Sequence, residues 1–383
     1  MKVALVHDYL REYGGAERVL EALHEMFPNA PLYTAYYNPT SLGIHADRFK
    51  NWDIRTSWIQ NLPLANKLIS PLRIFAPLAF DSFDLKEYDL VISSSAIYFA
   101  KAVITKPECL HLAYIHTPPR YLYGYATSFN YKKNPVTRVL GEIANHFLRL
   151  YDFETSQRPD VLVANSENTK MRIKKFYRRD AEVVYPPVDI KRLHTPASLV
   201  RVKSEEGKDG GYFLSLGRLV RGKGVETIVE ACAKAGVSLK VAGFGPEMAH
   251  LSALSSRLGA TNIEFLGAVT DEAKFELLAN AKALIVASED EDFGITNIES
   301  LSCGTPVLAF KAGGYLETVV EGKTGEFFDG ETAKEQIENL SEILKKFDPK
   351  KYSEAECRKQ SDKFSKEKFQ QKLLEVIKKN FKP

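Results

Sequence analysis

Short apolar runs alternate with longer amphipathic stretches along almost the whole chain, and this alternation limits the possible folds more than any other feature. Residues 283–287 (ALIVA) are apolar at every position, so a strand formed by them needs helices on both faces of its sheet. Strands that alternate with helices are typical of a parallel α/β architecture. We expect strands at residues 3–7, 32–36, 90–93, 110–116, 161–165, 183–185, 212–216, 239–242, 263–266, 283–287, 307–310 and 325–328, and helices at residues 16–26, 136–154, 224–235, 246–258, 271–279 and 330–345.

Two breaks in this pattern divide the chain into halves. Pro186-Pro187 ends one expected strand, and the polar, Gly-rich stretch 203–211 precedes the next, which is how proline and glycine commonly punctuate a chain. We therefore expect an α/β protein of two facing, doubly wound, Rossmann-like domains, residues 1–190 and 211–355, with a C-terminal helix at about 360–383 that packs back on the first. Ligands of such sheets bind beyond the carboxyl ends of the strands, so the cleft between the domains is the expected site.

Cysteine content, hydropathy and charge argue against several classes of protein. The four cysteines lie far apart, without a C-x-x-C pair or a histidine at metal-ligand spacing. This argues against a disulfide framework or a structural zinc site and favours a reducing, cytoplasmic compartment. No stretch approaches the roughly 18 apolar residues that a membrane-spanning helix needs, so we expect a protein that is soluble, or peripheral at the inner face of the plasma membrane. The net charge of +3 is too small to indicate a nucleic-acid binder.

A carboxylate-rich loop precedes a helix that is expected to begin near Thr296. Glu291 lies in the loop at the end of a strand, and Glu299 follows about one turn into the helix. The free amides of Gly294, Ile295 and Thr296 would point into the cleft and suit an anion such as a diphosphate. Ionised carboxylates accept hydrogen bonds from hydroxyl groups, so the layout suits a nucleotide sugar, with one glutamate for the sugar and one for the ribose. A solvated acidic loop ahead of a structural helix is the alternative interpretation.

A basic, Gly-rich loop at residues 217–224 follows the first strand of the second half. Its Arg218 and Lys223 would neutralise a departing diphosphate in the same cleft. The loop falls short of a P-loop because Gly224 replaces the Ser or Thr that would hold Mg²⁺, which disfavours an NTPase. We interpret the D-x-D sequence at residues 290–292 as accidental, since two cations would make a metal unnecessary.

Two positions in the first half are further candidates. The turn after the first expected strand contains Gly14-Gly15 but lacks G-x-G-x-x-G, which disfavours a dinucleotide-dependent hydride transfer. The paired glycines would let the backbone approach a phosphate or a sugar, or they merely start a helix. His116 ends a strand and would bind a sugar hydroxyl if it faces the cleft, although a lone histidine is as often structural. His7 and His111 are interpreted as strand residues without a site role.

Together these loops resemble the family 4 retaining glycosyltransferases, which have the GT-B fold of two facing Rossmann-like domains. The resemblance covers nearly the whole chain. It depends on the following motifs in this order: GGAE at 14–17, GRL at 217–219 with KG at 223–224, E-x7-E at 291–299 enclosing FG, GTPV at 304–307, and GG at 313–314 followed by Glu317 and Gly325.

The resemblance implies transfer from a nucleoside-diphosphate sugar with retained anomeric configuration and without a metal or other cofactor. It also implies roles. Arg218 and Lys223 would hold the diphosphate, Glu291 would bind the donor sugar and Glu299 the ribose. Backbone amides near Gly294 and Ile295 would contact the phosphate or the sugar, and the adjacent Phe293 and Thr296 are further substrate-binding candidates. Gly15 would lie under the diphosphate, with Gly14 as a further substrate-binding candidate, and His116 would lie beside the sugar. Recognition of the base would use backbone groups near Gly243 and Gly267. The expected chemistry is front-face substitution, in which the leaving diphosphate helps to deprotonate the acceptor hydroxyl.

Residues 114–122 (YIHTPPRYL), with His7-Asp8-Tyr9, look most similar to a mannosyltransferase subgroup that builds O-antigen and other surface polysaccharides. This similarity implies GDP-mannose as the donor. Asn297 departs from the apolar residue usual in the family. The alternatives are a GT-B-fold sugar-nucleotide epimerase and a non-catalytic sugar-nucleotide-binding protein.

The acceptor is expected to be a glycan or a lipid-diphosphate-linked saccharide. Basic residues gather on an expected helix at 170–179 and at Lys132-Lys133, and anionic headgroups attract such segments. We therefore expect peripheral membrane contact through the N-terminal domain. A solvated basic helix face is the alternative.

Overall fold

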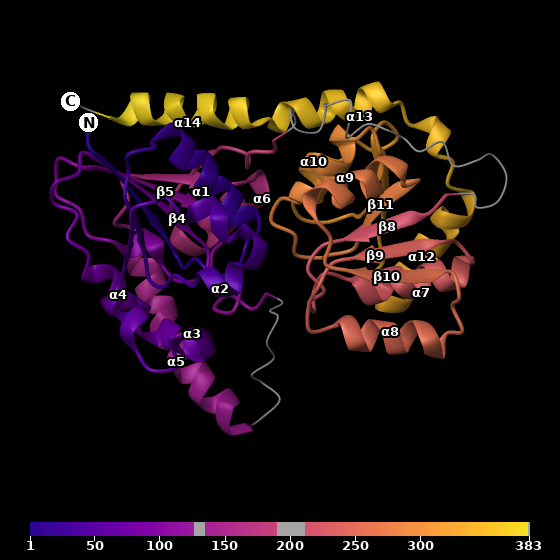
Figure 1. Ribbon diagram of the computed structural model, residues 1–383, viewed down its shortest axis with the longest axis horizontal. Helices are drawn as coiled ribbons and strands as arrows, with labels where there is room; N and C mark the ends of the chain where they lie inside the picture. The colour runs from indigo at the N-terminus through magenta and orange to yellow at the C-terminus, as the bar shows by residue number, and fades with distance from the viewer. Residues whose placement is uncertain (126–134, 190–210, 382–383) are drawn as a thin grey trace. The chain divides into compact units, whose positions relative to one another are not determined.

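The computed structural model describes residues 1–125, 135–189 and 211–381, and it divides into two compact units (Figure 1). Unit 1 comprises Met1–Pro187 and Glu367–Pro383, and unit 2 comprises Val188–Lys366. The last helix, which runs across the second boundary, therefore contributes to unit 1, whereas the residues just before it contribute to unit 2. Residues 190–210, where the sequence predicts a linker, lie outside the described residues, as do Lys132-Lys133.

Unit 1 is built on a seven-stranded parallel sheet with the order β3-β2-β1-β4-β5-β6-β7. The order reverses between β1 and β4, which makes the ends of these two strands the topological switch point of the sheet. Its strands are β1 Val3–His7, β2 Leu32–Thr34, β3 Ile54–Thr56, β4 Leu90–Ser95, β5 Leu110–Ile115, β6 Val161–Ala164 and β7 Glu182–Val183. Its α-helices are α1 Gly15–Met26, α2 Pro39–Leu42, α3 Ala65–Leu72, α4 Ala76–Asp81, α5 Pro135–Thr155, α6 Glu167–Tyr177 and α14 Lys366–Asn380.

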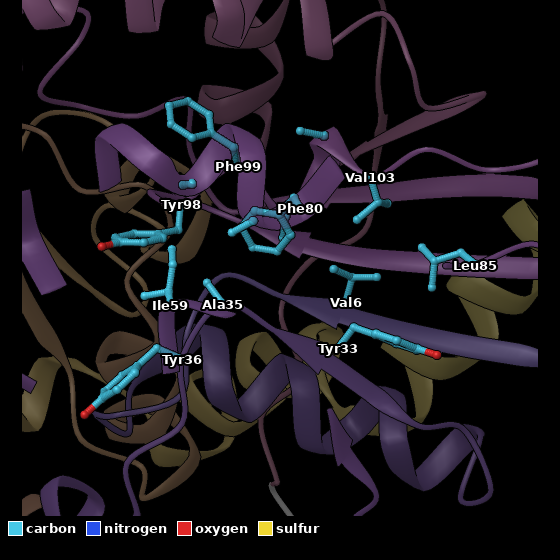
Figure 2. Packing of buried hydrophobic residues seen from close by; sticks show 14 of the residues in the cluster. Val6, Tyr33, Ala35, Tyr36, Ile59, Phe80, Leu85, Tyr98, Phe99 and Val103 are labelled. Atoms are coloured by element: carbon cyan, nitrogen blue, oxygen red, sulfur yellow. The ribbon is translucent and has the colours of Figure 1, made fainter. Parts of the chain in front are cut away.

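Both faces of this sheet are buried by separate hydrophobic clusters. Successive residues of β1 alternate between them, since Ala4 and Val6 belong to one cluster and Leu5 to the other. Figure 2 shows part of the first cluster from close by, with Val6 pointing toward Phe80 and Val103. A strand with period-two side chains that are apolar on both faces is what a doubly wound sheet requires.

Helix α14 covers part of the second cluster. Phe369, Leu373 and Val376 recur at helical spacing and are almost fully buried in it. The Phe369 ring lies edge-on to Tyr114 of β5, with the ring centroids 5.9 Å apart. The C-terminal helix is thus part of the core of unit 1.

Unit 2 contains a six-stranded parallel sheet with the order β10-β9-β8-β11-β12-β13, which reverses between β8 and β11. Its strands are β8 Phe213–Leu216, β9 Leu239–Ala242, β10 Ile263–Gly267, β11 Ala283–Val286, β12 Val307–Phe310 and β13 Gly325–Phe328. Its α-helices are α7 Val225–Ala235, α8 Met248–Arg257, α9 Asp271–Asn280, α10 Ile295–Ser302, α11 Tyr315–Thr318, α12 Ala333–Lys346 and α13 Glu354–Ser361. Val229 of α7 and Leu340 of α12 bury the same face of this sheet.

The two doubly wound α/β sheets confirm the predicted fold class. Each of the twelve expected strands is present, although β7 is shorter than residues 183–185 and begins one residue earlier. Strand β3 was not expected, because Ile54-Arg55-Thr56 is too short to show alternation. No helix in the described part of the chain is long and apolar enough to cross a membrane. All four cysteines are buried free thiols.

Candidate functional site

Two loops of unit 2 leave the sheet at the point where its strand order reverses. Residues 217–224 connect β8 to α7, and residues 287–294 connect β11 to α10. Because β8 and β11 are paired neighbours, both loops begin at the same edge of the sheet. Ligands of open α/β sheets bind at this position, and these loops carry the residues that the sequence singled out.

Lys223 and Glu291 connect these two loops. The Nζ of Lys223 lies 2.6 Å from Oε2 of Glu291, and the two side chains are 31% and 15% exposed. The hydroxyl of Tyr315 also donates to Glu291 Oε2, at 3.4 Å. An expected phosphate-binding cation and an expected sugar-binding carboxylate are therefore in direct contact and still partly open to solvent.

Glycines allow a third loop to pack against this pair. The amide of Gly314 donates to the backbone oxygen of Glu291 at 2.9 Å. Gly313 has φ +57°, and a Cβ added there would lie 2.4 Å from the same oxygen. Any side chain at Gly313 would therefore displace the backbone that presents Glu291.

Helix α10 begins four residues after Glu291 in the chain. Gly294 is its N-cap with φ +91°, and the helix runs from Ile295, one residue earlier than expected, so Thr296 is its second residue. The first amides of a helix have no partner within the helix and favour an anion. The side chain of Phe293 is 2% exposed and packs edge-on to Phe364 with the ring centroids 5.3 Å apart. The ring is therefore part of the hydrophobic packing of unit 2.

Glu299 has a different environment from Glu291. It is 2% exposed, and its Oε1 accepts a hydrogen bond from the Nζ of Lys274 at 2.8 Å. The same ammonium contacts Asp271 at 3.0 Å. The predicted ribose-binding carboxylate is thus held in a buried ion pair on α10, one turn from the helix start.

Backbone contacts tie together the ends of β8, β9 and β10. The amide of Gly217 donates to Ala242 at 3.1 Å, and the amide of Gly243 donates to Gly267 at 2.7 Å. A Cβ at Gly243 would lie 1.8 Å from the backbone oxygen of Gly217. Arg218 directly follows Gly217 in the chain and is exposed. The predicted base-binding glycines and this cation therefore lie at the same end of the sheet.

Asn297 has a structural role in α10. It is fully buried, and its Nδ2 donates to Thr318 Oγ1 on α11 at 3.0 Å. Its Oδ1 has no hydrogen-bond partner among the described residues. The departure from an apolar residue therefore provides a link between α10 and α11.

In unit 1 the predicted residues lie at the end of the sheet near its own switch point. Gly14 is the N-cap of α1, which begins at Gly15. The amide of Gly14 donates to Glu17 Oε2 at 2.8 Å. His116 directly follows β5 and is 8% exposed. Burial, and then the electrostatic effect of nearby His7, lowers the pKa of the His116 imidazole to about 3, so the ring is neutral at neutral pH.

Two residues that sequence reasoning had left out contribute to this end of the sheet. His7 Nδ1 lies 3.1 Å from Ser94 Oγ, which in turn lies 2.8 Å from His116 Nε2. Asp8 is 4% exposed and accepts hydrogen bonds from several backbone amides of the turn after β4, including Ala96 at 2.7 Å and Ala100 at 2.8 Å. His7 and Asp8 lie at the carboxyl end of β1, and this position in the sequence could have marked them as candidate site residues.

The basic helix α6 differs from a uniformly solvated face. Arg172 is buried at 7% exposure, and Arg179 donates to the backbone oxygen of Ser156 at 2.8 Å. Lys174 and Lys175 are exposed. Part of the predicted basic patch therefore stabilises unit 1 itself. Among the residues that the structure describes, no group of three His, Cys, Asp or Glu side chains is placed to hold a metal ion.

Comparisons with known proteins show which proteins this chain is similar to. Residues 198–379 match the family model described as glycosyl transferases group 1. The chain is 26% identical to the alpha-1,3/1,6-mannosyltransferase ALG2 of Debaryomyces hansenii, over 83% of this chain and 76% of that protein. It is 29% identical to the D-inositol 3-phosphate glycosyltransferase of Mycolicibacterium smegmatis, over 48% and 45% of the two chains. The solved structure of Anabaena Alr3699/HepE in complex with UDP-glucose covers 99% of this chain and is itself covered over its full length, with a TM-score of 0.72 and 19% identity. This likeness confirms the GT-B fold.

Proposed function

We propose that this chain is a retaining glycosyltransferase of group 1, and that it transfers mannose from the nucleotide-sugar donor GDP-mannose to a glycan or lipid-linked saccharide. The carrying observation is the contact between Lys223 and Glu291 at the switch point of unit 2. The likeness to the ALG2 mannosyltransferase over most of the chain supports mannose as the sugar. The resemblance of residues 114–122 to a mannosyltransferase subgroup supports it independently.

In the proposed mechanism the donor diphosphate is held by Arg218, Lys223 and the first amides of α10. An ammonium group has three N–H donors, so Lys223 can keep its bond to Glu291 and still donate to a phosphate oxygen. Its positive charge then offsets the negative charge that develops on the leaving diphosphate. The acceptor hydroxyl attacks from the same face of the sugar and passes its proton to the departing diphosphate, which preserves the anomeric configuration.

Glu291 and Glu299 bind different parts of the donor. Glu291 accepts hydrogen bonds from hydroxyl groups of the mannose, and Glu299 accepts them from the ribose. In unit 1, Gly14 and Gly15 lie under the diphosphate and His116 lies beside the sugar. Backbone groups near Gly243 and Gly267 contact the guanine.

A thermal-shift panel of nucleoside diphosphates and their sugars tests the donor. A ligand present at 100 times its dissociation constant stabilises the folded state by about 2.7 kcal/mol. We expect GDP and GDP-mannose to raise the melting temperature more than UDP, UDP-glucose or ADP. A shift confined to uridine nucleotides would overturn the assignment of the base.

A product assay separates the proposed reaction from its alternatives. With GDP-mannose and a lipid-linked saccharide, we expect an α-linked product, which retains the anomeric configuration of the donor. Addition of a metal chelator should not lower the activity. Consumption of the nucleotide sugar without an acceptor would instead identify an epimerase. Binding without any turnover would identify a sugar-nucleotide-binding protein.

We further propose that unit 1 contacts a membrane carrying the acceptor, through α5. The exposed apolar side chains on this helix lie on one face and include Leu140, Ile143, Phe147 and Leu150, each more than half exposed. The opposite face is anchored in unit 1 by the buried Leu148. A helix with one apolar face open to solvent is typical of interfacial binding, and the exposed Lys174 and Lys175 of α6 would add attraction to anionic lipids.

Co-sedimentation with vesicles tests this contact. We expect the wild-type protein to bind vesicles of phosphatidylcholine and phosphatidylglycerol, and Leu140→Ser with Phe147→Ser to weaken binding about tenfold or more, since two large apolar groups no longer enter the bilayer. Ile44→Ser, at a 77% exposed position outside α5, is the matched control. Equal binding by all three proteins would contradict the proposal.

A further inference from the structure

Four buried side chains form a hydrogen-bonded chain at the carboxyl end of the sheet in unit 1. His116 Nε2 lies 2.8 Å from Ser94 Oγ, and Ser94 Oγ lies 3.1 Å from His7 Nδ1. His7 Nε2 lies 3.5 Å from Glu17 Oε1, the longest separation in the chain. All four residues are at most 8% exposed, so water does not compete strongly for these contacts.

The parallel register creates this arrangement. His7 and Ser94 are Cα partners in the pairing of β1 with β4. Ser94 is the partner of Tyr114 in the pairing of β4 with β5, and His116 follows two residues after Tyr114, on the same side of the sheet as that residue. Glu17 lies in the first turn of α1, so two strands, the residue that follows a third strand and one helix each contribute one side chain.

The carboxylate sets the direction of the hydrogen bonds. Oε2 of Glu17 accepts a hydrogen bond from the amide of Gly14 at 2.8 Å, and an ionised carboxylate can only accept. His7 must therefore present Nε2–H to Glu17. When His7 is neutral, its Nδ1 is then an acceptor and takes the hydroxyl proton of Ser94.

Because each hydrogen bond needs one donor and one acceptor, the proton of Ser94 also determines which nitrogen of His116 is protonated. Once its proton points to His7, Ser94 Oγ can only accept from His116, so His116 Nε2 carries a proton. The neutral ring then has an unprotonated Nδ1. In the part of the chain that the structure describes, His116 Nδ1 has no hydrogen-bond partner.

We propose that Glu17, His7 and Ser94 are positioning residues that hold His116 in its Nε2–H tautomer, so that Nδ1 accepts a hydrogen bond from a hydroxyl group of the sugar. This inference rests on the proposed function, because it uses the place of His116 beside the sugar. Glu17 also caps the Gly14-Gly15 turn, so one carboxylate orients both elements that unit 1 offers to the donor.

The tautomer can be observed directly by two-bond ¹H–¹⁵N correlation NMR of the full chain labelled with ¹⁵N-histidine. The chain has eight histidines, and the His116 signals are assigned from their loss in His116→Gln. We expect a protonated Nε2 and an unprotonated Nδ1 in the wild-type protein. A proton on Nδ1 would overturn the inference whichever donor the enzyme uses.

Two variants interrupt the row of hydrogen bonds without replacing His116 itself. Ser94→Ala removes the bridge, and Glu17→Gln introduces an amide that can donate to His7 Nε2 and reverse every bond. We expect both to yield a mixed or reversed His116 tautomer and to lower kcat about 10-fold, because His116 Nδ1 then no longer accepts a hydrogen bond from the sugar. Ser94→Thr keeps a hydroxyl and is expected to restore the tautomer and most of the rate.

Ser93→Ala is the matched control. Ser93 Oγ makes an equally buried bond to a different histidine, His111 Nε2, at 2.9 Å. We expect this variant to leave the His116 tautomer and kcat unchanged. Equal loss of kcat in Ser93→Ala and Ser94→Ala, with an unchanged His116 spectrum in both, would overturn the positioning role. Failure of the wild-type protein to transfer mannose would count against the proposed donor and leave the NMR test of the tautomer in force.

Discussion

Lys223 and Glu291 form an ion pair across the two loops that leave the switch point of the second sheet. The pair keeps an ammonium and a carboxylate partly exposed, within 2.6 Å of each other, at the edge where α/β sheets bind their ligands. Ion pairs that stay partly open to solvent usually contribute little to stability. The arrangement therefore makes most sense as a binding feature, and that interpretation can be tested.

Lys223→Ala should lower kcat/KM with GDP-mannose about 100-fold, because removing one preorganised charge from the leaving group typically costs about 3 kcal/mol of transition-state stabilisation. The melting temperature should change little. Steady-state kinetics and thermal unfolding of the same preparation measure both. Arg221→Ala is the control, since Arg221 is an exposed cation in the same loop. Normal turnover by Lys223→Ala would remove this lysine from the mechanism.

Gly313→Ala should both destabilise unit 2 and abolish donor binding. The added Cβ would lie 2.4 Å from the backbone oxygen of Glu291, so the loop that presents Glu291 must move. Gly322→Ala is a closely matched control, because Gly322 also has a positive φ, +73°, but its Cβ would have no neighbour within 4 Å. We expect the control to cost about 1 kcal/mol through backbone strain alone and to keep its affinity for the donor. Urea unfolding and calorimetric titration with GDP distinguish the two variants, and equal effects would show that the contact with Glu291 is unimportant.

The fold could be predicted almost completely because its determinants are local. Apolar five-residue runs and amphipathic helices repeat often enough to reveal twelve strands, and the loops 217–224 and 288–299 were recognisable from unusual residues next to strand ends. The pairing of His7 with Ser94 depends instead on the register of two strands 87 residues apart, which no local pattern encodes. The C-terminal helix was expected to pack back on the first domain, and α14 contributes to unit 1, but no local pattern shows that α13, just before it, packs in unit 2.

Lowering the pH should destabilise the folded state through two buried histidines. Burial lowers the pKa of His116 and of His111 to about 3, whereas the unfolded chain takes up these protons near pH 6.5. The unfolded state therefore binds more protons between about pH 6.5 and pH 3, so the contribution of both groups is complete above pH 6.5 and is lost as the pH falls. Together they add a slope of up to about 2.7 kcal/mol per pH unit, from two protons at 1.36 kcal/mol each. Urea unfolding between pH 7 and pH 4 measures the slope, which His111→Gln should reduce by about half; an unchanged slope would mean that His111 titrates alike in both states.

Lys274 offers a way to separate the structural and binding roles of Glu299. The two side chains are 10% and 3% exposed and 2.8 Å apart. Lys274→Met leaves the Glu299 carboxylate buried without this cation, so the free energy of unfolding should fall by about 3–5 kcal/mol. Replacing both residues, as Lys274→Met with Glu299→Met, removes the uncompensated charge and should recover most of that loss. If Glu299 binds the ribose, the double variant should nevertheless bind GDP at least tenfold more weakly than wild type, because the hydroxyl groups lose their acceptor. Lys346→Met is the control for loss of a lysine, since its ion pair with Glu342 is largely exposed. A stable double variant with wild-type affinity for GDP would restrict Glu299 to the stability of α10.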